Sequence, residues 1–280
     1  MRVLVLGATG QIGRMLQWAW AYAGGIFPLW QTRGNPSTAD WVRCDILGDP
    51  VGLKAACTRA DVILTLAGIT PAPGRDLTLN SDLALAVQRA AGGRPHLLAS
   101  SAAVYGRADG LCRESDAVQP AAPYGGAKRA MEQTMLSEGG PVTCLRIGNV
   151  AGADQILGKA GKGATRKLDC FPDGRTPRRS YIGPATLAQV LADLAIAAGQ
   201  CRSLPDILNV ASPGTVEMGA LLDAAGSPWT PRTAPPDAIA EVALDTTTLN
   251  RFSGQDPATG TAAAFVAEWR TYQEAAPPPT

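Results

Sequence analysis

The sequence predicts an α/β protein: a Rossmann-type, doubly wound parallel sheet with a small C-terminal lobe. Two observations predict the sheet. Residues 3–6 form a short apolar run that ends at Gly7, which is typical of a buried parallel strand. Strand and helix patterns then alternate through the first half of the chain, and this order is typical of parallel strands joined by right-handed crossovers. With 46% hydrophobic residues among 280, the chain can bury a sizeable core.

The elements are expected in the following order. Strands are expected at residues 3–6, 26–30, 42–44, 62–66, 97–99, 142–147 and 207–210. Helices are expected at residues 11–23, 51–58, 77–91, 125–137 and 186–198. Residues 151–181 are rich in Gly, Lys and Arg without a clear period, and the rest is proline-rich, with short elements at 216–225, 246–251 and 262–273. We therefore expect a Rossmann domain of residues 1–150 plus 182–212, and a substrate lobe of residues 151–181 plus 213–280.

Charge and cysteine content exclude several function classes. The chain has 25 basic and 24 acidic residues, so it offers no electrostatic case for nucleic acid or an acidic membrane. Six cysteines without a CxxC pair, and His96 as the single histidine, predict no metal site. The first residues lack the pattern of a signal peptide, so we expect a cytoplasmic protein with reduced thiols.

A glycine-rich turn follows the first strand and opens the first helix. Small residues there let the backbone turn tightly and approach a pyrophosphate, which the free N–H groups of the helix start would bind. The residues of this turn expected to bind a dinucleotide are Gly7, Thr9, Gly10, Gln11, Ile12 and Gly13. The alternative is an ordinary strand–helix turn.

The end of the second strand bears on the choice of dinucleotide. It reads Gln31-Thr32-Arg33, without the acid that would accept hydrogen bonds from the ribose of NAD. Arg33 suits a 2′-phosphate, which favours NADP, with NAD as the alternative. Asp45, after the third strand, could bind the adenine amino group or cap a helix.

A phenol and an ammonium group are expected on one face of the helix at residues 125–137. Tyr124 and Lys128 are four residues apart, which places them one helical turn from each other. A lysine charge beside a tyrosine, together with the positive nicotinamide of the dinucleotide, favours the phenolate, so we expect a lowered pKa for Tyr124 and proton exchange with a hydroxyl or carbonyl. Ser100 and Ser101 end the strand before this helix, where ligands bind in open α/β sheets. A serine there could hold the reacting oxygen.

These features together resemble the extended short-chain dehydrogenase/reductase family of sugar-nucleotide epimerases, dehydratases and reductases. The resemblance rests on residues 7–13, 45–46, 66–68, 80, 100–106, 124–128 and 146–149, and weakly on 179–182 and 244–245. It implies Ser101, Tyr124 and Lys128 as catalytic residues. The residues expected to bind the cofactor are those of the glycine turn with Arg33, Asp45, Ile46, Leu66, Ala67, Gly68, Asn80, Ser100, Tyr124 and Lys128. Of these, Leu66, Ala67, Gly68 and Asn80 follow from the resemblance. It also implies that Asn149 and Arg179 face the diphosphate of a nucleotide-sugar substrate.

Two departures narrow the expected activity. Ala102 and Ala103 occupy positions where the family's 4,6-dehydratases carry an Asp-Glu pair, so that elimination of water is disfavoured. Gly183-Pro184-Ala185 replaces the family's usual histidine and acidic residues. We expect hydride transfer at a carbinol or keto carbon of a nucleotide-linked or related sugar, by an epimerase or a reductase. The alternative is an NADP(H)-binding regulator without turnover. The resemblance also implies a homodimer formed through the helices at 77–91 and 125–137.

Overall fold

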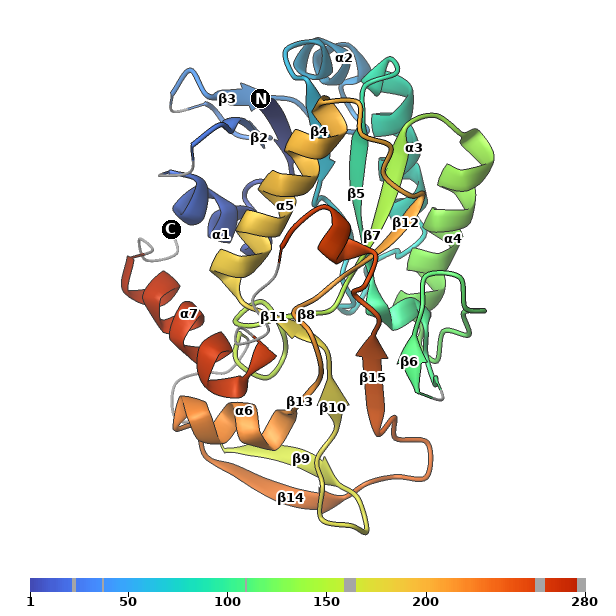
Figure 1. Ribbon diagram of the computed structural model, residues 1–280. Coiled ribbons are helices and arrows are strands. Elements are labelled where there is room, and N and C mark those ends of the chain that lie inside the picture. Colours follow the sequence, from blue (N-terminus) through green and yellow to red (C-terminus); the bar gives the residue numbers. More distant parts are fainter. Residues whose placement is uncertain (22–23, 37, 109, 159–164, 255–259, 276–280) are drawn as a thin grey trace.

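Seven parallel strands form the central sheet of the protein (Figure 1). The structure is a computed structural model that describes all residues except 22–23, 37, 109, 159–164, 255–259 and 276–280. The strand order is β12-β7-β5-β4-β1-β2-β3. The strands are β1 (Arg2–Leu6), β2 (Phe27–Thr32), β3 (Trp41–Arg43), β4 (Val62–Thr65), β5 (His96–Ser101), β7 (Val142–Ile147) and β12 (Ile207–Val210). The bounds of each of the seven strands lie within two residues of those expected.

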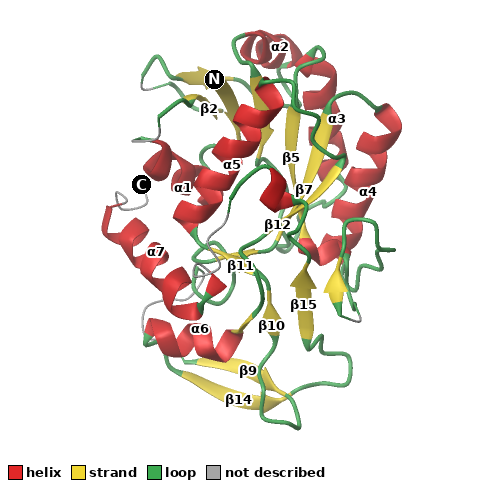
Figure 2. Ribbon diagram, viewed as in Figure 1, coloured by secondary structure: helices red, strands yellow, loops and turns green. Residues whose placement is uncertain are grey.

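Helices cover both faces of this sheet (Figure 2). Val3 and Val5 of β1 pack with residues of α1 (Gln11–Trp20) and α5 (Pro184–Gly199). Leu4 and Leu6 point to the other face and pack with α2 (Pro50–Thr58) and α3 (Leu79–Ala91), beside α4 (Pro123–Glu138). Burial on both faces explains why β1 is apolar at every one of these positions, and it confirms the doubly wound fold class.

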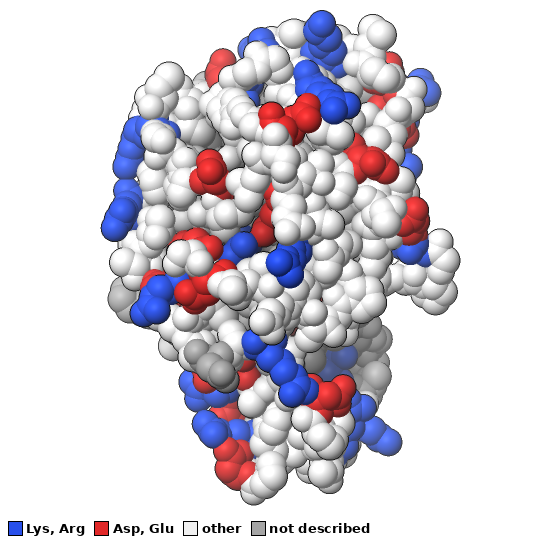
Figure 3. Space-filling view, turned by 90° about the vertical axis from the view of Figure 1, so that its right-hand side faces the viewer, with Lys and Arg blue, Asp and Glu red and all other residues white. Residues whose placement is uncertain are grey.

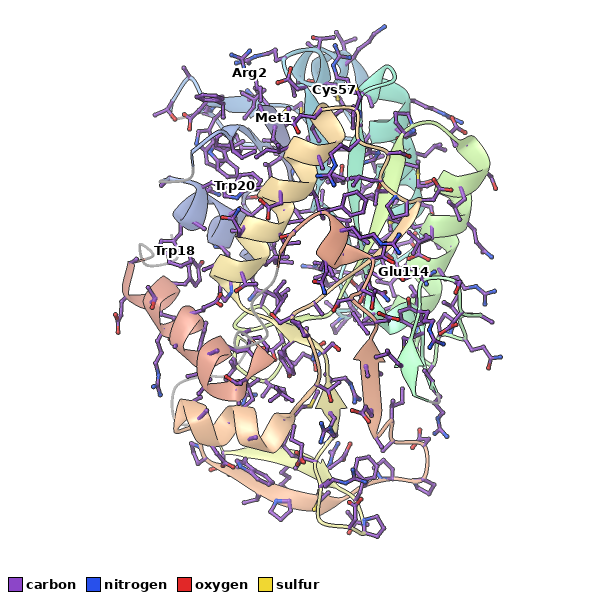
Figure 4. All side chains as sticks on the ribbon, viewed as in Figure 1. Met1, Arg2, Trp18, Trp20, Cys57 and Glu114 are labelled. Carbon is purple, nitrogen blue, oxygen red and sulfur yellow. The ribbon has the colours of Figure 1, made fainter. Side chains whose placement is uncertain are left out.

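The tryptophans of the first quarter belong to the core of one sheet face. Trp20 of α1 lies 5.9 Å from Trp30 of β2, and Trp30 lies 6.5 Å from Trp41 of β3, measured between ring centroids. Figure 4 labels Trp18 and Trp20 on α1, and Trp18 meets Tyr272 edge-on at 5.6 Å. These residues therefore serve packing. The expected helix at 11–23 ends at Trp20, and residues 22–23 lie outside the described part of the chain.

A smaller lobe lies below the main sheet in Figure 1. Its four-stranded sheet has the order β13-β10-β15-β6, and two strand pairs, β8–β11 and β9–β14, accompany it. The strands are β6 (Leu111–Cys112), β8 (Asn149–Val150), β9 (Arg166–Cys170), β10 (Arg178–Arg179), β11 (Tyr181–Ile182), β13 (Val216–Glu217), β14 (Trp229–Thr233) and β15 (Glu241–Leu244). The helices of the lobe are α6 (Met218–Ala225) and α7 (Ala262–Ala275). Two 3₁₀ turns lie beside the main sheet: η1 (Ala102–Val104) follows β5 and contacts α4 and β7, and η2 (Leu249–Arg251) contacts β12. Leu168, Tyr181, Leu221, Leu222 and Phe265 form the centre of the lobe's own core.

The sequence pattern missed most strands of the lobe. Residues 151–181 lack a period, yet β9, β10 and β11 lie there. A strand of two residues is too short to show the alternation of apolar and polar residues that marks a strand. Its pairing depends instead on contacts with distant segments. The single element expected at 216–225 is a strand, β13, followed by the helix α6.

The surface shows no single dominant charge on the face seen in Figure 3, where basic and acidic side chains are interspersed. None of the helices in the described ranges has both the length and the apolar character needed to cross a bilayer.

Candidate active site

The glycine turn lies where the strand order of the main sheet changes direction, between β1 and β4. Gly7 has φ +86°, and a Cβ on it would lie 2.5 Å from the Ala67 nitrogen, so only glycine fits. A Cβ on Gly13 would lie 2.3 Å from the Ala8 oxygen, so glycine also lets α1 pack on the turn. Gly10 stands before α1, and within the described chain no side chain caps this helix. The helix start therefore offers its N–H groups to an anion.

Gln31 fastens the turn to the neighbouring strands. Its Oε1 accepts a hydrogen bond from the Gly7 nitrogen at 3.0 Å, and its Nε2 donates to the Cys44 oxygen at 2.7 Å. The side chain is buried, and both ends of its amide are engaged. The sequence showed only that an acid is missing at this position. That a glutamine ties the turn to β3 could be seen only in the structure.

Arg33 and Asp45 come together at the ends of β2 and β3. The Asp45 carboxylate accepts hydrogen bonds from the Gly48 and Leu47 nitrogens at 2.7 and 3.0 Å. The hydrogen bond from Gly48 and the nearby Arg33 charge lower the pKa of Asp45. Asp45 thus closes a turn, while the cap of α2 is Asp49, which accepts from the Gly52 nitrogen at 2.8 Å. Ile46, beside Asp45, is buried in the core.

The segment after β4 meets α3 and α4. Leu66 and Ala67 donate their backbone N–H groups to the Leu6 oxygen, next to the glycine turn. A Cβ on Gly68 would lie 2.9 Å from Asn80 Oδ1 and 3.3 Å from Lys128 Nζ. Asn80 is buried and holds the backbone of Ile69 through both its amide oxygen and its amide nitrogen, each at 3.1 Å. The structure thus places the expected cofactor residues Gly68 and Asn80 beside the expected catalytic lysine.

Tyr124, Lys128 and Ser101 meet where β5 ends and α4 begins. Pro123 starts α4, and Tyr124 and Lys128 lie on its first two turns. The Tyr124 hydroxyl is hydrogen-bonded to the Ser101 side chain. Lys128 Nζ donates to the Ala99 oxygen at 2.9 Å. The close contact of α4 with η1 requires glycine at 125, because a Cβ there would lie 2.3 Å from the Ala103 oxygen.

Burial dominates the electrostatics of these groups. It lowers the pKa of Lys128 to about 8, while Cys144 and Glu132 act in the opposite direction. Burial raises the pKa of Tyr124, and the hydrogen bond with Ser101 opposes this rise. For the protein by itself the pKa of Tyr124 thus shifts upward, while the lowering expected with the positive nicotinamide bound stays a prediction. The phenol is protonated at neutral pH and is ready to act as an acid.

Ser100 has a different environment from Ser101. It is buried, and its hydroxyl donates to Glu132 Oε1 at 2.6 Å. Its side chain is therefore directed to α4 and is occupied there. The structure offers a cofactor at most the backbone of this residue.

Asn149 lies on β8 of the β8–β11 pair, and Arg179 lies on β10 of the four-stranded sheet. Asn149 is paired with Tyr181 across β8 and β11, and the two side chains are hydrogen-bonded. Arg179 donates to the backbone oxygens of Arg178, at 2.7 Å, and of Ile239, at 2.9 Å. No carboxylate of the described residues forms an ion pair with Arg179. β8 starts two residues beyond Ile147, which is the partner of Ser101 across β5 and β7. In the same described ranges, no group of three or more His, Cys, Asp or Glu side chains could hold a metal.

Comparison with known proteins identifies the family. The model of the NAD dependent epimerase/dehydratase family matches residues 3–174, which is more than half of the chain. The chain belongs to this family. The match confirms the resemblance seen in the sequence and the expected enzyme class, an NAD(P)-dependent epimerase or reductase of the extended short-chain dehydrogenase/reductase type. No comparison supports a regulator without turnover.

Solved structures of the epimerase/dehydratase family share the whole fold with this chain. A UDP-glucose 4-epimerase from Brucella ovis in complex with NAD is 19% identical with a TM-score of 0.79, over 95% of this chain and 96% of that one. A UDP-glucose-4-epimerase from Stenotrophomonas maltophila with bound NAD and formylated UDP-arabinopyranose is 20% identical, with a TM-score of 0.78 over 98% of both chains. An NAD-dependent NDP-hexosamine 5,6-dehydratase of tunicamycin biosynthesis is 20% identical, with a TM-score of 0.73 over 96% of this chain and 98% of that one. No curated protein sequence matches the chain significantly.

Proposed function

We propose that this family member interconverts a carbinol and a ketone on a nucleotide-linked sugar, or on a related sugar, with a nicotinamide dinucleotide. The observation that carries the proposal is the meeting of Ser101, Tyr124 and Lys128 at the end of β5, beside Gly68 and across the switch point from the glycine turn. An acid, a hydrogen-bond partner and a buried cation next to a dinucleotide loop suit hydride transfer coupled to proton transfer.

The residues of this chain would have the following roles in the reaction. The Tyr124 hydroxyl passes a proton to, or takes it from, the reacting oxygen, and Ser101 orients that oxygen through the hydrogen bond it already makes to the phenol. Lys128, held by the Ala99 oxygen, supplies a positive charge one turn away, which stabilises the phenolate when it forms. The bound dinucleotide would supply or accept the hydride. The glycine turn fits its pyrophosphate, because side chains are excluded there.

NADP is the dinucleotide that the β2 end supports. Gln31 is neutral and both ends of its amide are used, so it offers the adenosine ribose no free acceptor. Arg33 is exposed, and its guanidinium could pair with a 2′-phosphate. Structural neighbours of 16–19% identity were solved with NAD and a UDP-sugar acid, so NAD is the competing cofactor to test.

The residues expected to face the substrate favour a diphosphate group and disfavour elimination of water. Arg179 has no carboxylate partner among the described residues, and Asn149 lies on the adjoining strand pair. A phosphate would therefore neutralise a half-buried cation. Ala102 and Ala103 provide no second acid or base beside Ser101, so water would not be eliminated from the sugar. We also propose that residues 151–181 and 213–280 form the substrate lobe and that α3 and α4 pair with a second copy of the chain.

The test is turnover of nucleotide sugars by the wild type and by Tyr124→Phe. We expect the substitution to lower kcat by about 10²–10⁴-fold, because it removes the proton donor, and to leave NADPH affinity within about twofold. Tyr272→Phe, on α7, is the matched control and keeps wild-type activity. Stoichiometric oxidation of NADPH would identify a reductase, and turnover with catalytic cofactor an epimerase. If Tyr124→Phe kept full activity, the proposed chemistry would be wrong.

A further inference from the structure

A buried ion pair lies behind the proposed active site. Arg146 of β7 and Glu132 of α4 are 2.9 Å apart, and their side chains are only 6% and 3% exposed. No other ion pair among the described residues has both partners buried. A buried pair adds little to stability, because desolvation offsets the attraction, but it fixes the geometry of the groups it joins.

Neighbouring groups complete the hydrogen bonding of this pair. Ser100 donates to Glu132 Oε1 at 2.6 Å. Arg146 donates to the Tyr105 hydroxyl at 3.0 Å and to the Glu114 oxygen at 3.3 Å, and its guanidinium lies 4.8 Å from the centre of the Tyr105 ring. Figure 4 shows the labelled Glu114 where the main sheet meets the lobe. A fully satisfied network of this kind is rigid.

Glu132 follows the proposed catalytic residues Tyr124 and Lys128 along α4. Tyr124, Lys128 and Glu132 are spaced four residues apart on α4, and they contact the last three residues of β5. Tyr124 bonds to Ser101, Lys128 to the Ala99 oxygen and Glu132 to Ser100. Ser100 and Arg146 are direct partners across β5 and β7. Glu132 is thus held from two adjacent strands at once, which fixes both the rotation and the height of α4 at the sheet edge.

We propose that Glu132 is a positioning residue for the proposed reaction: held by Arg146 and Ser100, it fastens α4 to β5 so that Tyr124 and Lys128 face Ser101 and the dinucleotide. The inference rests on the proposed function. Glu132 touches neither cofactor nor substrate and acts through the helix and through Lys128.

The pKa of Lys128 reports directly on its interaction with Glu132. The titratable groups that act on it are Glu132, from the same helix, and Cys144, from β7, and both oppose the effect of burial. Removing the Glu132 charge therefore lowers the pKa of Lys128 further below its value of about 8. Lys128 would then lose its proton at a lower pH, and activity that needs the charge would fall there.

The experiment is an NMR titration of the lysine side chains, which number five in this chain. Lys128→Ala assigns the Lys128 signal. Glu132→Gln is expected to lower its midpoint by roughly one pH unit. The matched control is Glu138→Gln, on the same helix, where Glu138 forms an exposed pair with Arg89 and the midpoint stays in place. An unchanged Lys128 midpoint in folded Glu132→Gln would overturn the proposal.

Ser100→Ala carries the test if Glu132→Gln does not fold, since it removes one hydrogen bond and keeps the ion pair. We expect kcat to fall about tenfold, because a small displacement of α4 misaligns the proton transfer, with the KM and NADPH affinity unchanged. Ser137→Ala, exposed on α4, is the control. Equal kcat in the two variants would reject the positioning role. The NMR titration needs no ligand, so its result is separable from a failure of the proposed function, which would show as a wild type without turnover or NADPH binding.

Discussion

The proposed choice of NADP as the dinucleotide depends on single residues at the end of β2. Gln31 uses its amide to join the Gly7 nitrogen to the Cys44 oxygen, so it shapes the turn without presenting a charge. Arg33, two residues further on, is exposed, and its charge acts on Asp45. A neutral residue at the ribose and a cation beside it favour a phosphate on the 2′-oxygen, since a carboxylate there would repel it.

Arg33→Ala tests this choice at the residue scale. We expect NADPH affinity to fall about tenfold or more, because a charge-assisted hydrogen bond is lost, while NADH affinity stays within about twofold. Fluorescence titration of both cofactors measures it. Arg59→Ala, at the far end of α2, is the control. A wild type that prefers NADH, or an Arg33→Ala protein that loses both cofactors equally, would contradict the NADP assignment.

The N-terminus of α5 is capped by a side chain from a distant segment of the chain. α5 begins at Pro184 after Gly183, and its start has no side chain of its own to accept from the first N–H groups. Glu268 of α7 accepts from the Ala185 and Thr186 nitrogens, each at 2.9 Å, and from the Thr186 hydroxyl at 2.6 Å. An acid at a helix N-terminus is favourable for both its hydrogen bonds and its charge. This contact fixes α7 to α5.

Glu268→Gln measures this contact at the scale of the element. We expect a loss of about 1 kcal/mol in the free energy of unfolding, because the charge and one acceptor are removed. The melting temperature should fall by about 2–4 °C. Glu274→Gln, exposed near the end of α7, should leave it unchanged. Equal melting temperatures for the two variants would show that the cap does not stabilise α5.

Asn209 joins the seven-stranded sheet to the four-stranded sheet of the lobe. This residue of β12 is fully buried. Its Nδ2 donates to the Cys112 oxygen of β6 at 2.9 Å and to the Asp245 oxygen after β15 at 3.0 Å, and its Oδ1 accepts from the Tyr105 hydroxyl at 2.8 Å. Since Tyr105 also bonds to Arg146, which pairs with Glu132, one continuous network runs from α4 to the sheet of the lobe.

Asn209→Ala tests this network at the scale of the whole molecule. We expect a loss of about 2–3 kcal/mol in the free energy of unfolding, because buried carbonyl and hydroxyl groups lose their partner. Tyr105→Phe removes one member of the same network. The double variant should therefore lose less than the sum of the two single variants in denaturant titration. Strict additivity would show that the two residues act independently.

How far the sequence predicts the structure depends on the length of each element. β7 and β12 were predicted at the bounds that the structure gives, because both strands are largely apolar, although Thr143, Arg146 and Asn209 interrupt their apolar runs. The strands of the lobe have two to five residues and were not predicted as such, apart from β13 within a longer expected element. Gln31, Glu132 and Glu268 were also missed, since their partners lie 13 to 83 residues away and no local pattern marks them.

Local order was enough to predict the Rossmann core, the glycine turn at Gly7 and the Tyr124–Lys128 pair, because each depends on neighbours within a few residues. The roles of Ser100 and Ser101 could not be separated in this way, since they are adjacent in the chain and differ only in what faces them. Folding turns Ser100 to the buried Glu132–Arg146 pair and Ser101 to the phenol. It also buries Lys128 and half-buries Tyr124, and the resulting loss of hydration sets the direction of both pKa shifts.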